Sequence, residues 1–320
     1  MPADVAGIAL AAGALVLFSV NIVIMRFAMA KLDLDVGFII AMSVNLLVCA
    51  LFFAFQVAWR GSLPPWDGVA FAMFALAGVF STYLGRWFLY ESVARLGPAK
   101  ASTFQVSSPL FAVAIAWVFL HEVLNGAAIV GMAIAVIGLA LVGSVVQRKP
   151  QRRVAAPADI TLPNEPRRRS LALVQSGLLL GIGSSMAYAI GNVLRAAAVR
   201  RWSEAIAGAL IGAAAGVALQ FATDRSSLRR LRTLRTANRA GLALYTACGV
   251  LTITAQTLVI ASMAYIPVSI TALITLCTPL LVFPLSYFLL RNEEQLSLAT
   301  LAGSLVTLSG MALLILNRSA

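Results

Sequence analysis

The residues of this chain that could do chemistry are polar side chains placed at helical spacing inside long apolar runs. Tyr83, Arg86, Trp87 and Tyr90 follow one another at i, i+3, i+4 and i+7, a spacing that places them on one face of a helix. This face could line a cavity, with the aromatic rings against the apolar part of a ligand and Arg86 attracting an anionic group such as a carboxylate. The alternative is that Arg86 reaches toward the membrane surface and the aromatic rings form part of an interfacial belt.

Two prolines interrupt apolar runs in matching positions. Gln105 shares a helix face with Pro109, which follows Ser108, and Thr275 belongs to a threonine-rich face just before Pro279. A proline inside a helix donates no amide hydrogen bond and clashes with the preceding turn, so we expect both prolines to kink their helices and free a backbone carbonyl. The neighbouring polar side chains then become candidates for binding a ligand, unless their hydroxyls bond back to carbonyls of their own helix.

Amide and phenol side chains in other apolar runs complete the expected binding set, namely Asn21, Tyr188, Asn192 and Gln256. A polar group inside a membrane helix is costly and needs a partner. Asn21 and Asn192 lie at similar places in the two halves of the chain. For both of them, hydrogen bonding between helices is therefore the alternative to ligand contact.

Several classes of chemistry lack the residues that they require. His121 is the single histidine, and Cys49, Cys248 and Cys277 lie far apart inside apolar runs, so we expect no metal site, no disulfide framework and no cofactor. The sequence has no glycine-rich phosphate loop ending in Lys-Ser or Lys-Thr, which argues against ATP-driven pumping. It also has no nucleophile beside a base and no pair of carboxylates inside the runs, which argues against an enzyme and against ion coupling through a buried acid.

These side chains must be positioned by membrane-spanning helices. The chain is 61% hydrophobic and only 11% charged, and its apolar runs are about 20 residues long, the length that crosses a bilayer as a helix. We therefore predict an all-α polytopic membrane protein with ten transmembrane helices. Their expected ranges are 5–25, 36–57, 68–90, 99–120, 126–146, 171–194, 205–223, 240–263, 268–290 and 296–316.

The chain is expected to be a tandem repeat. The run that contains Pro109 ends before Glu122, the run that contains Pro279 ends before Glu294, and two glycines follow each glutamate at the same spacings. The predicted parts are a first repeat at 1–146, a basic polar linker at 147–170 and a second repeat at 171–320. Because each repeat has an odd number of helices, the second enters the membrane from the opposite side. Such inverted five-helix repeats, with a site where they meet, are a recurrent transporter design.

The basic residues predict the orientation of the chain. The formal net charge is +12, but the basic side chains lie mainly in connections between apolar runs, where they indicate topology and contact with lipid headgroups and not nucleic-acid binding. Of the 24 Lys and Arg residues, all but five fall on the side that carries the linker. The exceptions are Arg60, Arg195, Arg200, Arg201 and Arg318. Since positive residues concentrate on the cytoplasmic side, both termini are predicted to be non-cytoplasmic.

Several segments together match a known pattern. They are GRWFLY at 85–90, RLGPAKAS at 95–102, SPLF at 108–111, FLHE at 119–122 and, in the second half, TPL at 278–280 with Glu294, Gly303 and Gly310. They resemble the signature of the EamA family in the drug/metabolite transporter superfamily. The resemblance implies ten helices in two inverted repeats and secondary transport, usually export, of amino acids or other small metabolites across the bacterial inner membrane. Members of that superfamily are often described with cytoplasmic termini, whereas the basic residues here predict the opposite.

The expected function is therefore secondary transport, by alternating access through a central cavity, of small and partly apolar metabolites such as amino acids. The alternative is a multidrug carrier or a carrier of sugars or nucleotide sugars. A membrane enzyme or a non-transporting scaffold would need a catalytic constellation or a soluble module. The expected partners are a small-molecule substrate and membrane lipids. Gly208, Gly212 and Gly216, four residues apart, favour close packing within one chain, with a homodimer interface as the alternative, so a monomer or a homodimer is expected.

Overall fold

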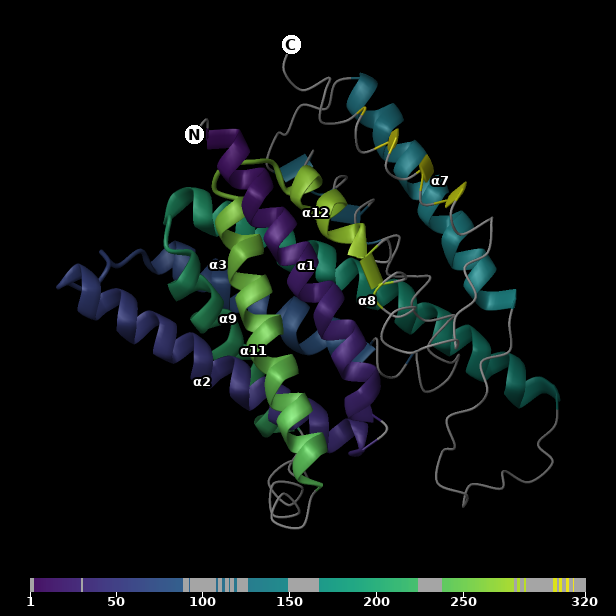
Figure 1. The fold of residues 1–320 in the computed structure, drawn as a ribbon, viewed down its shortest axis with the longest axis horizontal. Helices are drawn as coiled ribbons and strands as arrows, with labels where there is room; N and C mark the ends of the chain where they lie inside the picture. The colour runs from purple at the N-terminus through teal and green to yellow at the C-terminus, as the bar shows by residue number, and fades with distance from the viewer. Residues whose placement is uncertain are drawn as a thin grey trace. The chain divides into compact units, whose positions relative to one another are not determined.

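In the computed structural model, the described parts of the chain consist of helices and their connections, without strands. The structure describes residues 3–29, 31–88, 126–148, 167–223 and 238–278, and also 92, 108, 111–112, 115, 118–119, 281–282, 285, 302–303, 305–306, 309–310 and 313. The helices are α1 (Ala3–Met29), α2 (Leu34–Arg60), α3 (Gly68–Ala77), α7 (Gly126–Arg148), α8 (Arg167–Arg201), α9 (Ala205–Thr223), α11 (Arg239–Ser262) and α12 (Val268–Leu276) (Figure 1). A π-helical segment, η1 (Gly78–Leu84), continues directly from α3.

Five stretches of these helices are long and apolar enough to cross a membrane. They are Ala3–Met25, Val36–Arg60, Gly68–Phe88, Ala205–Thr223 and Arg239–Ser262, and each coincides within a few residues with a span expected from the sequence. α7 and α8 cover two more expected spans, while most of 99–120, 296–316 and the second part of 268–290 lie outside the described residues. An all-helical membrane architecture is thus confirmed where the structure describes the chain, and the count of ten helices stays a prediction.

α2 ends where the backbone can no longer continue a helix. Gly61 has a φ of 71°, a left-handed conformation that glycine adopts at little cost, and its amide donates to the carbonyl of Val57 at 2.9 Å. This is the common glycine cap of a helix C-terminus. Pro64 and Pro65 follow, and they lack the amide hydrogen that a continuing helix would need.

The third helix of each half begins with the same side-chain cap. Oδ1 of Asp67 accepts hydrogen bonds from the amides two and three residues later, both at 3.0 Å, and so starts α3. Oδ1 of Asn238 accepts the equivalent two hydrogen bonds, at 2.9 and 3.4 Å, and so starts α11. Asp and Asn are among the strongest helix N-caps because their short side chains reach amides that no carbonyl of the first turn can satisfy.

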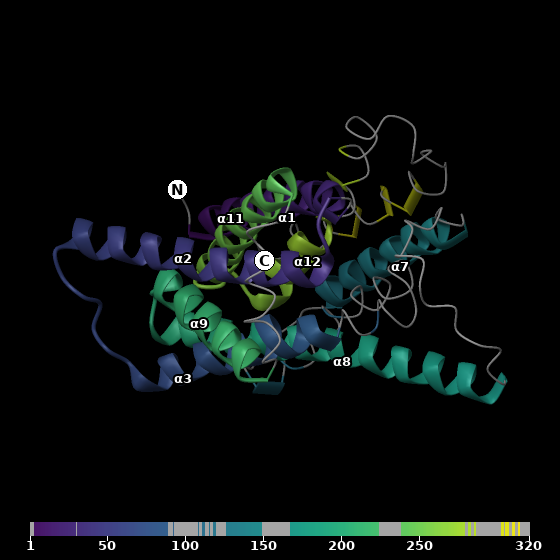
Figure 2. The same ribbon diagram turned by 90° about the horizontal axis from the view of Figure 1, so that it is seen from below.

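The chain packs into two compact units, each of which contains segments from both halves of the sequence. Unit 1 comprises Met1–Tyr83, Ala112–Val123 and Ala189–Gln295, and unit 2 comprises Leu84–Phe111, Leu124–Tyr188 and Leu296–Ala320. In unit 1, α11 packs against α1, α2 and α9, and α1 also contacts α12 (Figure 1). Figure 2 shows α9 between α2 and α3, both of which it contacts.

Two contacts in unit 1 repeat each other with the halves exchanged. A Cβ atom added at Gly37 of α2 would overlap the ring of Tyr245 on α11, and a Cβ atom added at Gly208 of α9 would overlap the ring of Phe74 on α3. Both rings are buried. Each glycine lies 171 positions from its counterpart, as does each aromatic residue. The second helix of each half therefore packs against the third helix of the other half through the same pair of positions.

The glycines of α9 form an interface within the chain. A Cβ atom at Gly78 would overlap the backbone of Gly212, and one at Gly216 would lie 2.6 Å from the Thr82 side chain. These contacts fall on the end of α3 and on η1, so α9 approaches this helix at backbone distance. The expectation that Gly208, Gly212 and Gly216 serve packing within one chain is confirmed for this face of α9.

In unit 2, serine hydroxyls join α8 to the helix that follows η1. Oγ of Ser184 donates to the carbonyl of Gly85 at 2.8 Å, and Oγ of Ser92 donates to the carbonyl of Gly177 at 3.0 Å. All four residues are buried. Hydroxyls of this kind hold membrane helices together because lipid offers no competing hydrogen-bond partners.

Candidate functional site

The aromatic face expected on the third helix is described as far as Phe88, and Tyr83, Arg86 and Trp87 have different surroundings. Tyr83 ends unit 1, where its hydroxyl lies 2.6 Å from Oγ1 of Thr223 on α9. In unit 2, Arg86 is half-buried and Trp87 is 48% exposed, with its ring 5.4 Å from the ring of Phe88. The exposed indole fits either a cavity wall or an interfacial belt, the two roles that the sequence left open.

Four of the expected site residues lie outside the described residues. They are Tyr90, Gln105, Pro109 and Pro279. Ser108 is described and half-buried. Their assignment to ligand binding or to helix kinks stays a prediction.

The hydroxyls before Pro279 bond to their own helix. Oγ1 of Thr275 donates to the carbonyl of Thr271 at 2.9 Å, and Oγ1 of Thr278 donates to the carbonyl of Thr275 at 2.6 Å. This is the arrangement that the sequence offered as the alternative to ligand contact. One further hydroxyl pair bridges two helices, since Oγ of Ser262 and Oγ1 of Thr271 are 3.2 Å apart and buried.

Asn21 lies where α1 meets α11. Its backbone carbonyl accepts a weak hydrogen bond from the thiol of Cys248 at 3.9 Å, but its side-chain Oδ1 is buried and accepts no hydrogen bond. A buried amide oxygen without a donor costs roughly 1–3 kcal/mol. Among the described residues of the expected set, Asn21 is therefore the one whose acceptor a ligand donor would satisfy.

Asn192 contacts Arg195, a residue that lay outside the membrane span expected from the sequence. Its Oδ1 accepts a hydrogen bond from Nη1 of Arg195, one helical turn further along α8, at 3.2 Å. The expected span ended at residue 194, but α8 continues to Arg201, and Arg195 is only 4% exposed. Arginines inside membrane helices are rare and mostly face the interior of the bundle, so Arg195 joins the candidate site residues. The spacing of Asn192 and Arg195 was the signal in the sequence that could have found this pair.

The two remaining expected residues, Tyr188 and Gln256, lie in different units. Tyr188 is half-buried on the part of α8 that belongs to unit 2, and Gln256 is half-buried on α11 in unit 1. Within the residues that the structure describes, no group of three or more His, Cys, Asp or Glu could hold a metal ion.

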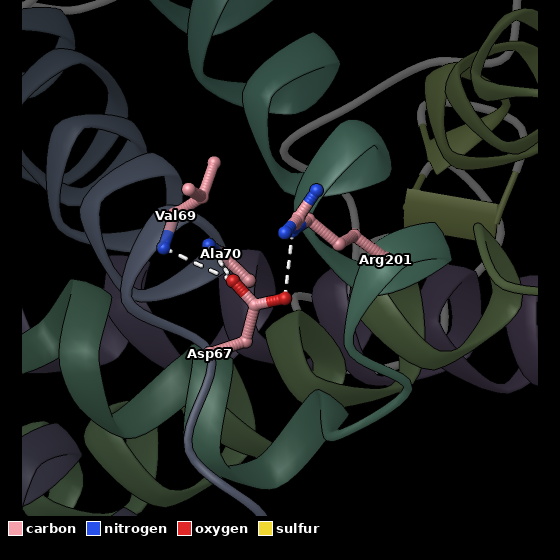
Figure 3. A network of polar contacts seen from close by, with 4 residues as sticks. All are labelled: Asp67, Val69, Ala70 and Arg201. Atoms are coloured by element: carbon pink, nitrogen blue, oxygen red, sulfur yellow. Dashed lines mark hydrogen bonds and ion pairs between the residues drawn. The ribbon is translucent and has the colours of Figure 1, made fainter.

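A second polar cluster, which the sequence analysis did not single out, lies where α2 and α8 end and α3 and α9 begin. Oδ2 of Asp67 accepts a hydrogen bond from Nε of Arg201 at 2.6 Å, as Figure 3 shows. Nearby, Glu204 accepts hydrogen bonds from Nε2 of Gln56 at 2.9 Å and from Nη1 of Arg60. All of these residues stand at or near helix ends, which was the only signal of them in the sequence.

The charge of Asp67 is stabilised by its surroundings. The hydrogen bond from the amide of Ala70 is the main cause that lowers the pKa of the Asp67 carboxyl, and the hydrogen bond and positive charge of Arg201 lower it further, against an opposing effect of desolvation. The amide of Val69 adds a smaller contribution. Asp67 is thus an anion at neutral pH that both caps α3 and holds the end of α8.

Comparison with known proteins agrees with this architecture. A family model described as the EamA-like transporter family matches residues 5–144 and 175–316. A solved structure described only as "Crystal structure of protein" superposes with a TM-score of 0.70 at 15% sequence identity, over 98% of each chain, and this likeness shows the fold alone. None of the curated proteins matches the sequence.

Proposed function

The chain belongs to the EamA-like transporter family, and from this premise we propose that it is a secondary transporter that carries small metabolites across a membrane by alternating access. It is a multi-pass membrane protein with several apolar helices. α2 exposes Leu47, Leu51, Phe55 and Trp59 at four-residue spacing, a face that fits contact with lipid chains.

The observation that carries this proposal is the exchange of contacts between the halves in unit 1. Gly37 lies against Tyr245, and Gly208 lies against Phe74, so α2 meets α11 as α9 meets α3. A pseudo-two-fold axis that exchanges the two halves would produce this reciprocity, and in an inverted repeat this axis lies in the membrane plane. Carriers built from inverted repeats bind their substrate near such an axis and alternate by rocking one set of helices against the other.

The proposed substrate is a small molecule with a polar or anionic group and an apolar part, such as an amino acid. Asn21 and the Asn192–Arg195 pair belong to the first helix of each half, and the two asparagines are 171 positions apart. They would recognise the polar group, since the arginine can pair with a carboxylate and the unsatisfied oxygen of Asn21 can accept from an amine. Tyr83, which belongs to the same unit as these residues, would contact the apolar part.

We propose that the chain exports its substrate across a bacterial inner membrane. Both chain ends would then lie outside the cytoplasm. The support is the distribution of basic residues in the sequence together with the family resemblance. A carrier of drugs, sugars or nucleotide sugars is the competing assignment. Free sugars and cationic drugs lack the anionic group that a buried arginine favours, whereas a nucleotide sugar carries an anionic diphosphate but is a much bulkier substrate.

A counterflow screen in proteoliposomes tests the proposal. The purified chain is reconstituted in liposomes loaded with an unlabelled candidate, and uptake of the labelled compound is measured for panels of amino acids, sugars and cationic drugs. We expect uptake of at least one carboxylate-bearing compound, which depends on the protein and is abolished when the inside is not loaded. If no panel gives exchange, or if only cationic drugs do, the assignment to metabolite carriage is wrong.

Variants of the binding residues sharpen this screen. Asn21→Ala, Asn192→Ala, Trp87→Ala and Gln105→Ala should each reduce exchange of the identified substrate. Lys31→Gln is the matched control, because Lys31 is exposed in the α1–α2 connection. If Trp87→Ala and Gln105→Ala both leave exchange unchanged, these two residues do not line the cavity.

A further inference from the structure

One end of unit 1 carries charged groups that the proposed binding residues do not include. There the connection between α8 and α9 is tied to two helices of the first half of the chain, α2 and α3. The contacts are Arg201 with Asp67 at the start of α3, Trp202 with the ring of Phe74 inside α3, and Glu204 with Gln56 and Arg60 at the end of α2. Three of four consecutive residues thus bind three separate positions on α2 and α3.

We propose that the ion pairs Asp67–Arg201 and Arg60–Glu204 form an ionic latch, which holds this end of the carrier closed and must open when the substrate site is exposed to that side of the membrane. The inference rests on the proposed alternating access. α2 and α3 come from one half of the sequence and α8 and α9 from the other, so the two ion pairs join the halves at this end of unit 1.

One ion pair of the latch is not repeated at the equivalent positions of the other half. The exchange of halves that relates Gly37 to Gly208 also relates Asp67 to Asn238 and Arg201 to Ala30. Asn238 caps its helix as Asp67 does, but Asn and Ala cannot form an ion pair. The helix cap is therefore repeated, while the charge pair Asp67–Arg201 is not.

The latch is partly exposed. The side chains of Arg60 and Arg201 are 42% and 55% exposed, whereas Glu204 is only 8% exposed, so removal of Arg60 alone would leave a buried carboxylate without its charged partner. Two neighbouring polar atoms, Oε1 of Gln56 and Nε1 of Trp202, are buried without a hydrogen-bond partner. Opening would expose both atoms to water, which would offset part of the energy of the ion pairs.

The native thiol of Cys49 lies close to the latch, and its reactivity would report whether the latch opens. Sγ of Cys49 on α2 lies 3.6 Å from the carbonyl of Ile206 in the first turn of α9 and is fully buried. Separation of α2 from α9 at this end would expose Cys49 to water. Cys248 and Cys277 are also buried, in α11 and just after α12, and serve as internal references.

The experiment labels the full chain in sealed spheroplasts and in inside-out vesicles with a membrane-impermeant thiol reagent, and quantifies each cysteine by peptide mass spectrometry. The two test variants are Asp67→Asn, which keeps a capping side chain and removes the charge, and Glu204→Gln. In each of them we expect the labelling rate of Cys49 to rise about tenfold from one side only. This is the change produced by loss of one charge-assisted hydrogen bond. The double exchange Arg60→Glu with Glu204→Arg should return the rate toward that of the native chain.

Matched variants separate the latch from general loosening. Asn238→Asp and Lys31→Gln change charge elsewhere in unit 1 and should leave the labelling rate of Cys49 at that of the native chain. If the latch variants lower thermal stability while the labelling rate of Cys49 stays at the native value, the ion pairs are structural and the latch is refuted. A parallel rise at Cys248 and Cys277 would mean unfolding and would refute it equally. Because labelling needs no substrate, a failed substrate screen and a failed latch give different results.

Discussion

Asp67 and Asn238 cap the third helix of their respective halves with the same two hydrogen bonds, and Asp67 also binds Arg201. The two residues are 171 positions apart, and each accepts from the amides two and three positions later. Nε of Arg201 lies 2.6 Å from the second carboxylate oxygen of Asp67. The shared cap serves folding, and the carboxylate of Asp67 adds a charged contact with the end of α8.

The cap at Asn238 is expected to matter for stability alone. Asn238→Ala removes the acceptor for two amides at the start of α11 and should cost about 1 kcal/mol, which lowers the Tm in detergent by roughly 2–4 °C for a chain of this size. Asn238→Asp, which keeps the acceptor, is the control and should not lower the Tm. Equal Tm values for the native chain and Asn238→Ala would show that the cap contributes nothing.

The contribution of Asp67 should depend on pH in a defined direction. Its pKa is lowered below the ordinary value of 3.8, so the folded protein holds the proton less tightly than the unfolded chain does. The resulting stabilisation is complete above the ordinary pKa and is lost as the pH falls through the lowered pKa in the folded state. The Tm difference between the native chain and Asp67→Asn should therefore be constant from about pH 5 to pH 8 and shrink below about pH 4. A difference that shrinks near pH 6 or 7 would contradict this assignment.

Gly78 is expected to tolerate no side chain. A Cβ atom there would overlap the backbone of Gly212, which cannot move aside as a flexible side chain can. Gly78→Ala should destabilise the protein by roughly 1–3 kcal/mol through overpacking, measured as a lowered Tm. Gly126→Ala is the matched control, because nothing lies within 4 Å of a Cβ atom at the exposed start of α7. A Tm for Gly78→Ala as high as that of the control would mean that α3 and α9 do not approach at this point.

Arg195 is expected to be needed for transport of an anionic substrate. Arg195→Gln removes the buried charge and should reduce counterflow of a carboxylate-bearing substrate by about tenfold or more, while Arg195→Lys, which keeps the charge but lacks the planar fork, should retain part of it. Tm values in detergent check that both variants fold. If Arg195→Gln transports normally, the buried arginine serves packing and the recognition of an anionic group lies elsewhere.

The orientation of the chain is expected to follow its basic residues. A topology reporter fused within the linker at Arg153 should give a cytoplasmic signal, and a topology reporter fused after Ala320 should give a non-cytoplasmic signal. The two fusions are each other's controls, since they should give opposite readings. A cytoplasmic reading at the C-terminus would overturn the predicted orientation.

The sequence by itself determined where the membrane helices lie. Hydrophobic length decides whether a helix can span a bilayer, and this is a local property. For this reason the spans at 36–57, 68–90 and 205–223 agree closely with α2, with α3 and its continuation, and with α9. The equivalent positions of Asn21 and Asn192 in the two halves could also be recognised from the sequence, because a duplication leaves equivalent residues at a constant separation.

Only the tertiary structure decided what the polar residues touch. Arg195 seemed to lie beyond the end of its span, because an arginine lowers local hydropathy whether it faces lipid, water or other helices. Its burial depends on the neighbours that surround α8. The pairing of Asp67 with Arg201 and of Arg60 with Glu204 likewise joins residues more than a hundred positions apart. Such pairs form because packing brings helix ends together, and no pattern within either helix encodes its partner.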